Sequence, residues 1–498
     1  MSTQALAVDV AVVGAGPAGL AAAVAAAGAG LAVAVVDSNP QPGGQYWRHR
    51  DESAGESTRG QHESATYVDL RRRFDDARAA GRLHYLPNSQ VWFIENPSTD
   101  PTADAADPAP PQFALRLTGF SDVGPRPAQD QVVARRLILC PGGYDRQLPI
   151  PGWDLPGVMA AGGVQAMLKG YGTRTGTKAI VAGTGPFLLP VATGLAEGGV
   201  EVVGVCEAGA VTGWIRQTGG AVQVPSKARE AADYALALAR HRIGYWTRTA
   251  IVAINGTDEV RSVTVAKLDR HGRIRPGTSR EIAVDLVALG WGFTPSLELV
   301  TAVGADTRVD VDGSLVAVVD DAQQTTVNGV YAAGEVTGVG GAALAVLEGE
   351  LAGRAVARAA IGAVDPRRWG QLQGRSRRAR AFAGAMHRAH PVPAQWPDWL
   401  TESTTVCRCE EVSYGELCYA RDELGAGDAR TLKSLSRPGM GWCQGRVCGF
   451  ATAQLAALPE ANGPIGAEAL RPVAKRPLCA PIALGELAAL ADAERWGH

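Results

Sequence analysis

The chain has 498 residues, too many for one ordinary domain, and this length predicts about two to four domains. With 46% hydrophobic and 20% charged residues, its composition is that of a folded globular protein, which excludes a largely disordered chain. The 48 basic and 50 acidic residues nearly cancel and no basic cluster stands out, so the charge pattern argues against a nucleic-acid-binding protein.

The apolar N-terminal region is expected to belong to the fold and not to a secretory signal peptide. It has no basic leading segment, and Gly14, Gly16, Pro17 and Gly19 interrupt its apolar run. No other stretch has the pattern of a membrane span. We therefore expect a cytoplasmic protein.

Residues 7–37 have the pattern of a strand, a glycine-rich turn, a helix and a second strand that ends in an acid. The first glycine of the turn permits a sharp reversal, the second lets a pyrophosphate approach the backbone, and the third lets helix and strand pack closely. Free N–H groups at the helix start then attract phosphate. An acid at the end of the second strand can accept the ribose hydroxyls. The residues of this predicted dinucleotide site are Gly14, Gly16, Pro17, Ala18, Gly19 and Asp37.

Two further segments favour FAD over NAD at this first site. Gly43, Gly44 and Gln45 follow shortly after the acid, where a glycine pair can run beneath an extended flavin dinucleotide. Gly334 and Glu335 open a second expected helix start, with an acid placed to reach the ribityl chain. The residues expected to approach the isoalloxazine ring are Trp47 and Arg48.

The same pattern returns in the middle of the chain, which indicates an internal repeat. A strand over 178–182, a turn, a helix over 187–197 and a strand over 201–206 are expected there. Leu188 stands where the third glycine of the repeat belongs, and its bulk should separate helix from strand or shift the turn. This second nucleotide site is therefore predicted to be degenerate. Its residues are Gly183, Gly185 and Glu207.

Four of the eight cysteines form two close pairs near the C-terminus. In a cytosolic chain such pairs favour metal ligands over disulfides, and two thiolate pairs suit an iron–sulfur cluster. Zinc is the main alternative, although the spacing of the first pair is tight for a zinc site, and free thiols are a second alternative. Cys418 is expected on a helix in the core. The candidate ligands are Cys407, Cys409, Cys443 and Cys448.

The layout over roughly residues 7–360 resembles the two-dinucleotide-domain flavoproteins, the superfamily of glutathione and thioredoxin reductases. The segment from Leu139 to Gly152 looks like the crossover between the two domains in that family. Disulfide reductases carry a cysteine pair beside the flavin, but no thiol follows Gly44 here. Cys140 and Cys206 are lone residues, expected to be buried apolar fillers, so dithiol chemistry is not predicted.

The cysteine segment resembles the bacterioferritin-associated ferredoxin-like [2Fe–2S] domain. The whole chain resembles the larger accessory subunits of opine oxidases, D-hydroxyproline dehydrogenases and hydrogen cyanide synthase, and part of heterotetrameric sarcosine oxidase. The resemblance implies FAD, a [2Fe–2S] cluster on the four paired cysteines, and an amino-acid-oxidase-like partner subunit. It also opens three further possibilities: a small ferredoxin-like subunit, FMN at a subunit interface, and NAD(P) or ATP at one nucleotide site.

The expected fold class is α/β, with two Rossmann-like domains and a small helical cluster domain. The expected ranges are 1–155 with 298–362 for the FAD domain, 156–297 for the degenerate domain, 363–400 for a linker, 401–456 for the cluster domain and 457–498 for a tail. The leading hypothesis is an electron-transfer subunit of an amine or imino-acid dehydrogenase. A self-sufficient NAD(P)H-dependent reductase is the alternative, and a non-catalytic scaffold or redox sensor is the third.

Overall fold

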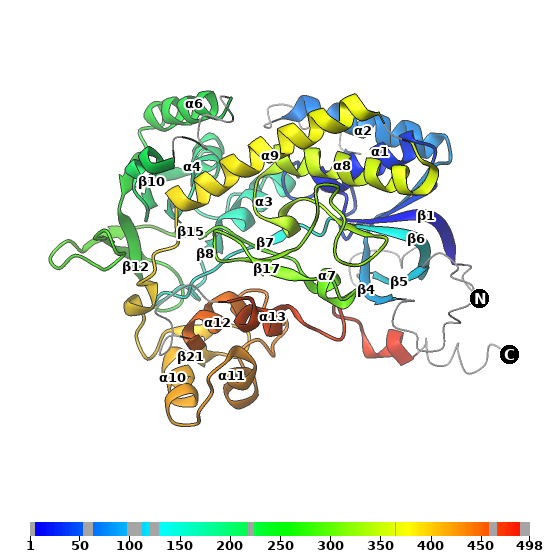
Figure 1. Ribbon diagram of the computed structural model, residues 1–498. Helices are drawn as coiled ribbons and strands as arrows, with labels where there is room; N and C mark the ends of the chain where they lie inside the picture. Colours follow the sequence, from blue (N-terminus) through cyan, green and yellow to red (C-terminus); the bar gives the residue numbers. More distant parts are fainter. Residues whose placement is uncertain are drawn as a thin grey trace.

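A computed structural model describes residues 5–52, 63–96, 112–119, 129–217, 219, 224, 226–363, 365–457 and 466–488. Most of residues 95–112, a Pro- and Asp-rich stretch whose sequence predicts an exposed loop, and most of residues 51–64, a polar stretch expected to be a surface loop or the start of a helix, lie outside these described residues. The described chain forms two α/β units with a smaller, mainly helical unit packed against both (Figure 1). The predicted α/β fold class with Rossmann-like units is confirmed.

The first unit is built on a seven-stranded sheet with the order β3-β2-β1-β6-β5-β4, to which β19 adds beside β6. The pairs β3-β2-β1-β6-β19 are parallel, whereas β5 runs antiparallel to both β6 and β4. The buried runs of Val, Ala and Leu in β1 and β2 suit a sheet covered on both faces. The strands are β1 Leu6–Val13, β2 Val33–Val36, β3 Leu83–Leu86, β4 Ser89–Glu95, β5 Phe113–Gly119, β6 Gln131–Leu139 and β19 Val330–Ala332.

The second unit repeats the parallel arrangement in a five-stranded sheet of order β11-β10-β9-β15-β8. Its strands are β8 Val158–Ala160, β9 Lys178–Gly183, β10 Glu201–Glu207, β11 Gly244–Thr247 and β15 Leu286–Gly290. An antiparallel sheet extends from it, formed by β12 Thr249–Asn255, β13 Ser262–Lys267 and β14 Arg280–Ala283. Three further pairs of described strands are β7 Gly143–Asp145 with β16 Phe293–Pro295, β17 Thr307–Val309 with β18 Leu315–Ala317, and β20 Thr405–Cys407 with β21 Val412–Ser413.

Small residues let two helices of the first unit touch along their lengths. A β-carbon at Gly349 would lie 2.0 Å from the carbonyl oxygen of Ala18, so α8 packs directly on the backbone of α1. The remaining helices cover the two sheets (Figure 1). The helices of these units are α1 Pro17–Gly28, α2 Ser64–Ala79, α3 Ala161–Tyr171, α4 Leu188–Glu197, α6 Ser226–Arg240, α7 Glu298–Ala302 and α8 Ala342–Ile361, with the 3-10 turns η3 Val211–Gln217 and η4 Glu335–Thr337.

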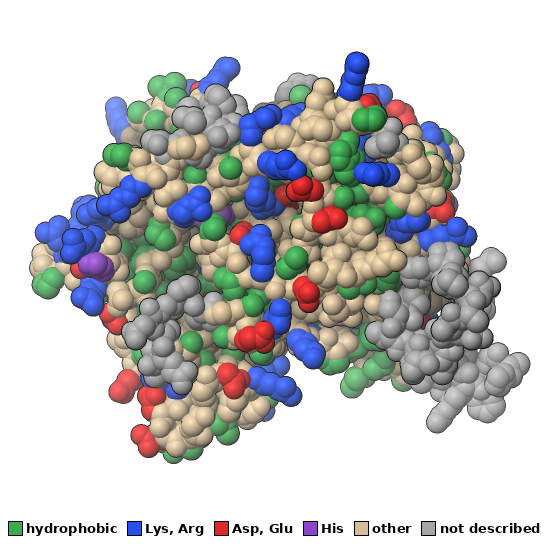
Figure 2. Space-filling view, in the orientation of Figure 1, with side chains coloured by type: hydrophobic (Ala, Val, Ile, Leu, Met, Phe, Trp, Pro, Cys, Tyr) green, Lys and Arg blue, Asp and Glu red, His purple; other side chains and the backbone are tan. Residues whose placement is uncertain are grey.

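Residues 363–400, expected to be a linker because their sequence has no clear periodicity, contain the 24-residue helix α9 Pro366–Ala389 and the 3-10 turn η5 Trp396–Trp399. The helix begins in a conventional way, because the Asp365 carboxylate accepts hydrogen bonds from the N–H groups of Arg367 and Arg368. It runs beside α8 and ends over the second unit (Figure 1). Figure 2 has the same orientation, and Lys and Arg side chains stand out in its upper part, where α9 lies in Figure 1.

The C-terminal unit joins the cores of both α/β units. Trp396, Leu417 and Phe450 share a core with strands of the second unit. The segment after residue 457, expected to be a tail, includes a further helix, and the Cys479 N–H donates to the Trp92 carbonyl on β4. Within the described residues, no helix is both long enough and apolar enough to cross a membrane. The helices of this unit are α10 Tyr414–Asp422, α11 Ala429–Ser436, α12 Gly449–Ala457 and α13 Ala467–Ala474.

Candidate functional site

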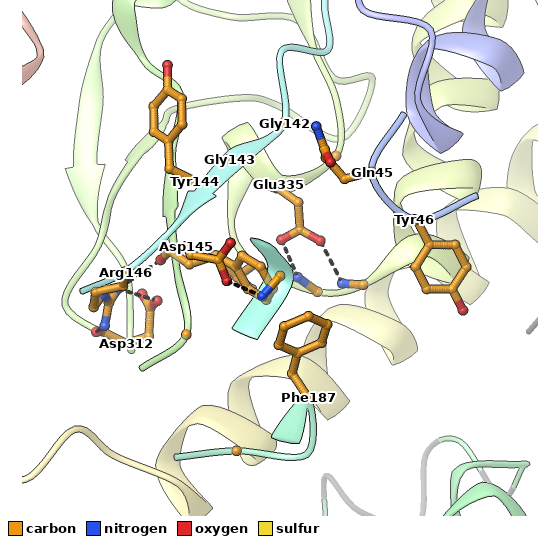
Figure 3. A pocket seen from close by; sticks show the side chains of 18 of the residues that line it. Gln45, Tyr46, Gly142, Gly143, Tyr144, Asp145, Arg146, Phe187, Asp312 and Glu335 are labelled. Atoms are coloured by element: carbon orange, nitrogen blue, oxygen red, sulfur yellow. Dashed lines mark hydrogen bonds and ion pairs between the residues drawn. The ribbon is translucent and has the colours of Figure 1, made fainter. Parts of the chain in front are cut away.

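One cavity of about 1680 Å³ extends from the first glycine turn, between the two α/β units, to the C-terminal unit. Gln45 and Tyr46 from the first unit face Phe187 from the second unit across it, and Asp145 projects from the crossover segment (Figure 3). Its wall includes most residues of the predicted first site, one residue of the second site, and part of the C-terminal unit. These residues are Gly14, Gly16, Pro17, Ala18, Asp37, Gly44, Gln45, Gly334 and Glu335; Gly185; and Tyr414, Arg446, Phe450, Gln454 and Cys479.

The first glycine turn presents an open helix start to the cavity. Helix α1 begins at Pro17 without a side-chain cap and without an acid in its first turn, so its N–H groups are available to phosphate. A β-carbon at Gly19 would lie 1.7 Å from the Gly14 carbonyl oxygen, so this position requires glycine. A β-carbon at Gly44 would lie 2.8 Å from the Cα atom of Gly16. Gly43 donates its N–H to the Ala15 carbonyl at 2.9 Å, so the glycine pair is held against the turn.

The Asp37 carboxylate is fixed at the end of β2, where it lines the cavity. It accepts hydrogen bonds from the N–H groups of Ala15 at 2.5 Å and Asn39 at 2.6 Å, and from the Asn39 side chain at 2.8 Å. Burial raises the pKa of Asp37 despite these hydrogen bonds. The carboxylate therefore stands, already oriented, at the position that a ribose-binding acid takes in this type of unit.

Glu335 also lines the cavity, but its carboxylate is hydrogen-bonded to backbone N–H groups of the loop that follows it. It accepts hydrogen bonds from the N–H groups of Gly340 at 3.2 Å and Gly341 at 3.0 Å, just before α8 (Figure 3). Burial raises the pKa of Glu335 to about 7, against the opposing effect of these hydrogen bonds and of Arg380. The residue is thus a carboxyl group that titrates near neutral pH at the cavity wall.

Trp47 and Arg48 were expected to approach a flavin ring, and neither lines the cavity. The Trp47 side chain is fully buried and packs against the Tyr67 ring at 5.3 Å between centroids. The neighbouring Tyr46 faces the cavity instead. The loop therefore presents Gln45 and Tyr46 to the cavity and turns the next two side chains away from it.

Asp145 on β7 is a cavity residue that sequence reasoning missed. Its carboxylate accepts the Gly162 N–H at 3.1 Å, at the start of α3. Burial raises the pKa of Asp145, against this hydrogen bond. It follows the predicted crossover glycines closely, but a lone acid in a short strand has no distinctive pattern.

The second glycine turn differs from the first in the way that Leu188 predicted. Helix α4 begins at Leu188, two positions later in the repeat than α1, which begins at Pro17. The Leu188 side chain is fully buried, and a β-carbon at Gly290 would lie 2.9 Å from it, so a glycine on the facing strand makes the room. The bulky residue has therefore shifted the turn.

Glu207, the expected ribose ligand of the second site, is fully buried and already bound within the chain. Its oxygens accept hydrogen bonds from the Gly185 N–H at 2.9 Å, the Gly209 N–H at 2.7 Å and the Thr184 hydroxyl at 3.0 Å. The Nδ1 atom of His390 lies 3.3 Å away, at ion-pair distance. Burial alone would raise the pKa of Glu207, but its interactions with His390 and with backbone N–H groups hold it below the usual range.

The end of α9 covers this second acid. Trp214 on η3 donates its indole N–H to Nε2 of His390 at 2.9 Å, which leaves Nδ1 directed towards the acid. The Pro391 carbonyl lies 3.5 Å from the Thr184 hydroxyl, and Gly213 packs on the backbone of Ala389. His390 was missed because it lies in the expected linker, far along the chain from the glycine turn.

The four paired cysteines come together as two pairs of touching thiols. Cys407 contacts Cys448, and Cys409 contacts Cys443. The Gly439 N–H points at the Cys407 sulfur at 3.4 Å. The pKa of Cys407 is lowered to about 6, first by its contact with Cys448 and then, against burial, by backbone N–H groups. The group thus combines sulfur donors with the N–H contacts that stabilise thiolates.

Two adjacent thiol pairs suit a cluster of two irons better than a single ion, because each iron of a [2Fe–2S] cluster takes two cysteines. Within the described residues, no group of three or more Cys, His, Asp or Glu side chains is gathered closely enough to hold a metal ion, so the four sulfurs stand as two separate pairs. Cys418 stands apart on α10, with its sulfur 3.7 Å from the Arg421 guanidinium. Cys140 and Cys206 are buried as expected, and burial raises the pKa of Cys206 to about 12.

Comparison with known proteins agrees with this architecture. Residues 8–359 match the family described as pyridine nucleotide-disulphide oxidoreductase. The A subunit of opine oxidase from Rhizobium meliloti is 31% identical over 97% of this chain and 99% of its own length. The HcnB subunit of hydrogen cyanide synthase from Pseudomonas protegens is 28% identical over 89% of this chain and 90% of its own.

A solved structure shares the fold over nearly the whole chain. L-proline dehydrogenase from P. horikoshii superposes with a TM-score of 0.66 at 19% identity, covering 98% of this chain and 80% of the other. At that identity, the likeness concerns the fold alone.

Proposed function

The chain belongs to the pyridine nucleotide-disulphide oxidoreductase family, and from this premise we propose that it is the electron-transfer subunit of a hetero-oligomeric, flavin-dependent amine or imino-acid dehydrogenase. A partner subunit of the amino-acid-oxidase type removes hydride from the substrate C–N bond. Bound FAD supplies two-electron chemistry, and a [2Fe–2S] cluster passes electrons on singly. This chain's residues hold both groups and set their potentials.

The observation that carries the proposal is the continuity of the cavity. The same space that begins at the Gly14–Gly19 turn is bounded at its other end by residues of the cysteine-bearing unit. Arg446, which lies between two candidate ligands in the sequence, is part of that wall. A flavin bound in this cavity would therefore face a wall that belongs partly to the loop carrying two of the candidate cluster ligands.

Each site offers what its proposed group needs. At the first site, Gly16 and Gly44 leave the backbone open to a pyrophosphate, and Asp37 stands ready for a ribose. At the other, Cys407, Cys409, Cys443 and Cys448 supply four sulfurs, with N–H groups directed at them. The chemistry of these residues thus supports both FAD and a [2Fe–2S] cluster as the groups proposed. FAD is also the cofactor that membership of this family supports.

The Glu207 carboxylate already accepts hydrogen bonds from its own chain, which weighs against the alternative of a self-sufficient NAD(P)H reductase. A ribose at the second site would have to displace His390 and the hydrogen bonds from Gly185 and Gly209. Without a nicotinamide site the chain needs another electron donor, which the proposal assigns to the partner subunit. Relatives named as subunits of opine oxidase and hydrogen cyanide synthase support that dependence and supply the amine class of substrate.

An anaerobic titration of the purified chain tests the proposal. Flavin bands with a broad iron–sulfur shoulder are expected in the oxidised visible spectrum. We expect NADH and NADPH to leave it unchanged, and dithionite to bleach it. Adding a partner flavoprotein of the amino-acid-oxidase type, with its amine substrate, should bleach both chromophores. Bleaching by stoichiometric nicotinamide alone would instead establish the reductase.

A pair of cysteine variants tests the cluster ligands. Cys443→Ser should lose the cluster, because one sulfur donor of an iron is replaced by a poor ligand. Iron content and the electron paramagnetic resonance (EPR) signal of the dithionite-reduced protein measure the loss. Cys418→Ser is the matched control, since that thiol lies outside the two pairs, and it should keep both signals. Equal iron content in the two variants would contradict the assignment.

A further inference from the structure

Arg446 joins the cysteine loop to the cavity wall through every part of its guanidinium group. Its Nε atom donates to the Tyr144 hydroxyl at 2.8 Å and lies 3.0 Å from the Glu298 carboxylate. One terminal nitrogen donates to the Cys479 carbonyl at 3.0 Å. The other donates to the Gln444 side chain at 3.1 Å and lies 3.5 Å from the Cys443 carbonyl.

These contacts connect three separate parts of the fold. Tyr144 belongs to β7 in the crossover, beside the glycines that bound the first site, and its hydroxyl also donates to Glu298 at 3.2 Å. Glu298 begins α7. Arg446 itself lies in the loop that carries Cys443 and Cys448. A hydrogen-bonded route from the cavity wall to that loop therefore passes through one side chain.

The local charge around this connection is positive and shielded from water. Arg476 approaches the same Glu298 carboxylate at 3.9 Å and donates to the Gln444 side chain at 3.0 Å. The side chains of Arg446, Arg476 and Glu298 are 16%, 12% and 9% exposed. Two guanidinium groups thus share one carboxylate beside the cysteine loop. A buried charge acts with far less screening than a surface one.

We propose that Arg446 is a positioning residue that fixes the cysteine loop against the cavity wall and raises the reduction potential of the cluster through its charge. The inference rests on the proposed function, since it requires a cluster on the four cysteines. Reduction adds one electron, and therefore one negative charge, to the cluster. A buried guanidinium beside the loop stabilises the reduced form more than the oxidised form, so the equilibrium of the electron shifts from flavin to cluster.

The midpoint potential of the cluster, measured by EPR-monitored redox titration of the full-length protein, tests the proposal. Arg446→Gln should lower it by about 59 mV, which corresponds to a tenfold change in the equilibrium of a one-electron couple. Glu298→Gln should shift it in the opposite direction, because the two arginines then lack their counter-charge. Tyr144→Phe removes a hydrogen bond without changing charge and should leave the potential close to that of the wild type.

Arg437→Gln is the matched control for loss of a positive charge. This arginine lies near the same loop and pairs with Glu410, but its side chain is 66% exposed. Solvent screening should leave the potential unchanged. If Arg446→Gln fails to retain iron, Glu298→Gln decides alone, because its predicted upward shift has no purely structural explanation.

Three outcomes would overturn the inference. These are an unchanged potential in both Arg446→Gln and Glu298→Gln, a downward shift in Glu298→Gln, and an equal shift in Arg437→Gln. A wild-type protein without any iron–sulfur EPR signal would overturn the proposed function itself, and the iron analysis of the wild type separates that result from the others.

Discussion

The two glycine turns of this molecule share one sequence pattern, but they differ in whether a ligand could reach them. The acid of the first turn lines the cavity, whereas the acid of the second is buried. At the first turn, Gly19 allows α1 to start at once, and Asp37 lines an open cavity. At the second, Leu188 delays the start of α4, and Glu207 is buried beneath the end of another helix. A dinucleotide motif therefore predicts a local backbone shape, whereas the rest of the chain decides whether that shape is available to a ligand.

Exchanging the residues at the third glycine position of the two turns, Gly19 and Leu188, should have the largest effect on flavin content. Gly19→Leu introduces a side chain where even a β-carbon would lie 1.7 Å from the Gly14 carbonyl oxygen. We expect bound flavin to fall below about a tenth of the wild-type content, because the helix start can no longer approach the pyrophosphate. The reciprocal Leu188→Gly variant should keep its flavin. Flavin released on denaturation, measured by absorbance, compares the two, and equal contents would contradict the distinction.

Neutralising the acid of each site should separate ligand binding from stability. Asp37→Asn should weaken FAD binding about tenfold to a hundredfold, since a hydrogen bond to a charged group contributes about 1.5–3 kcal/mol. Glu207→Gln should leave FAD binding unchanged but lower the free energy of unfolding by about 1–3 kcal/mol, because a buried acceptor loses charge-assisted partners. Flavin fluorescence titration and chemical denaturation measure the two effects. Weaker FAD binding in the Glu207→Gln variant would contradict the view that only the first acid binds FAD.

Glu335 and Glu207 should make the stability of the protein depend on pH with opposite signs. The pKa of Glu335 is raised to about 7, so its contribution to stability is present below pH 4.5 and is lost as the pH rises through 7. Glu335→Gln should therefore become more stable relative to the wild type over this window, by on the order of 1–3 kcal/mol. The pKa of Glu207 is lowered, so its contribution is lost as the pH falls through the lowered value. Thermal melts from about pH 2 to about pH 8 on both variants check the signs.

The smallest effect is expected from His390→Ala, which removes the imidazole that lies 3.3 Å from the Glu207 carboxylate. We expect a loss of about 1 kcal/mol in the free energy of unfolding and still no bleaching by NADH, because the shifted turn at Leu188 remains. Bleaching in this variant would show that the end of α9 gates a competent nicotinamide site. Anaerobic NADH titration against the wild type gives the answer.

Sequence reasoning succeeded where a property depends on neighbouring residues in the chain. The shift at Leu188 followed from the bulk of one side chain, and both strand–turn–helix repeats lie where periodicity predicted them. It failed for α9, whose Arg-rich sequence hides the apolar periodicity, although Asp365 before Pro366 is a recognisable helix start. It also could not find Tyr144, Glu298 or His390, because their partners lie more than a hundred residues away. The domain boundaries and the cluster ligands stay predictions.

Helix α9 has a mechanical consequence for the molecule. A helix of 24 residues is about 36 Å long. It lies along the first unit beside α8, where Arg380 forms an ion pair with Glu348, and its far end is held on the second unit through His390. A strut fixed at both ends opposes swivelling of one unit relative to the other. We therefore expect the two α/β units to keep a constant separation on either side of the cavity, with no rotation of one unit relative to the other during turnover.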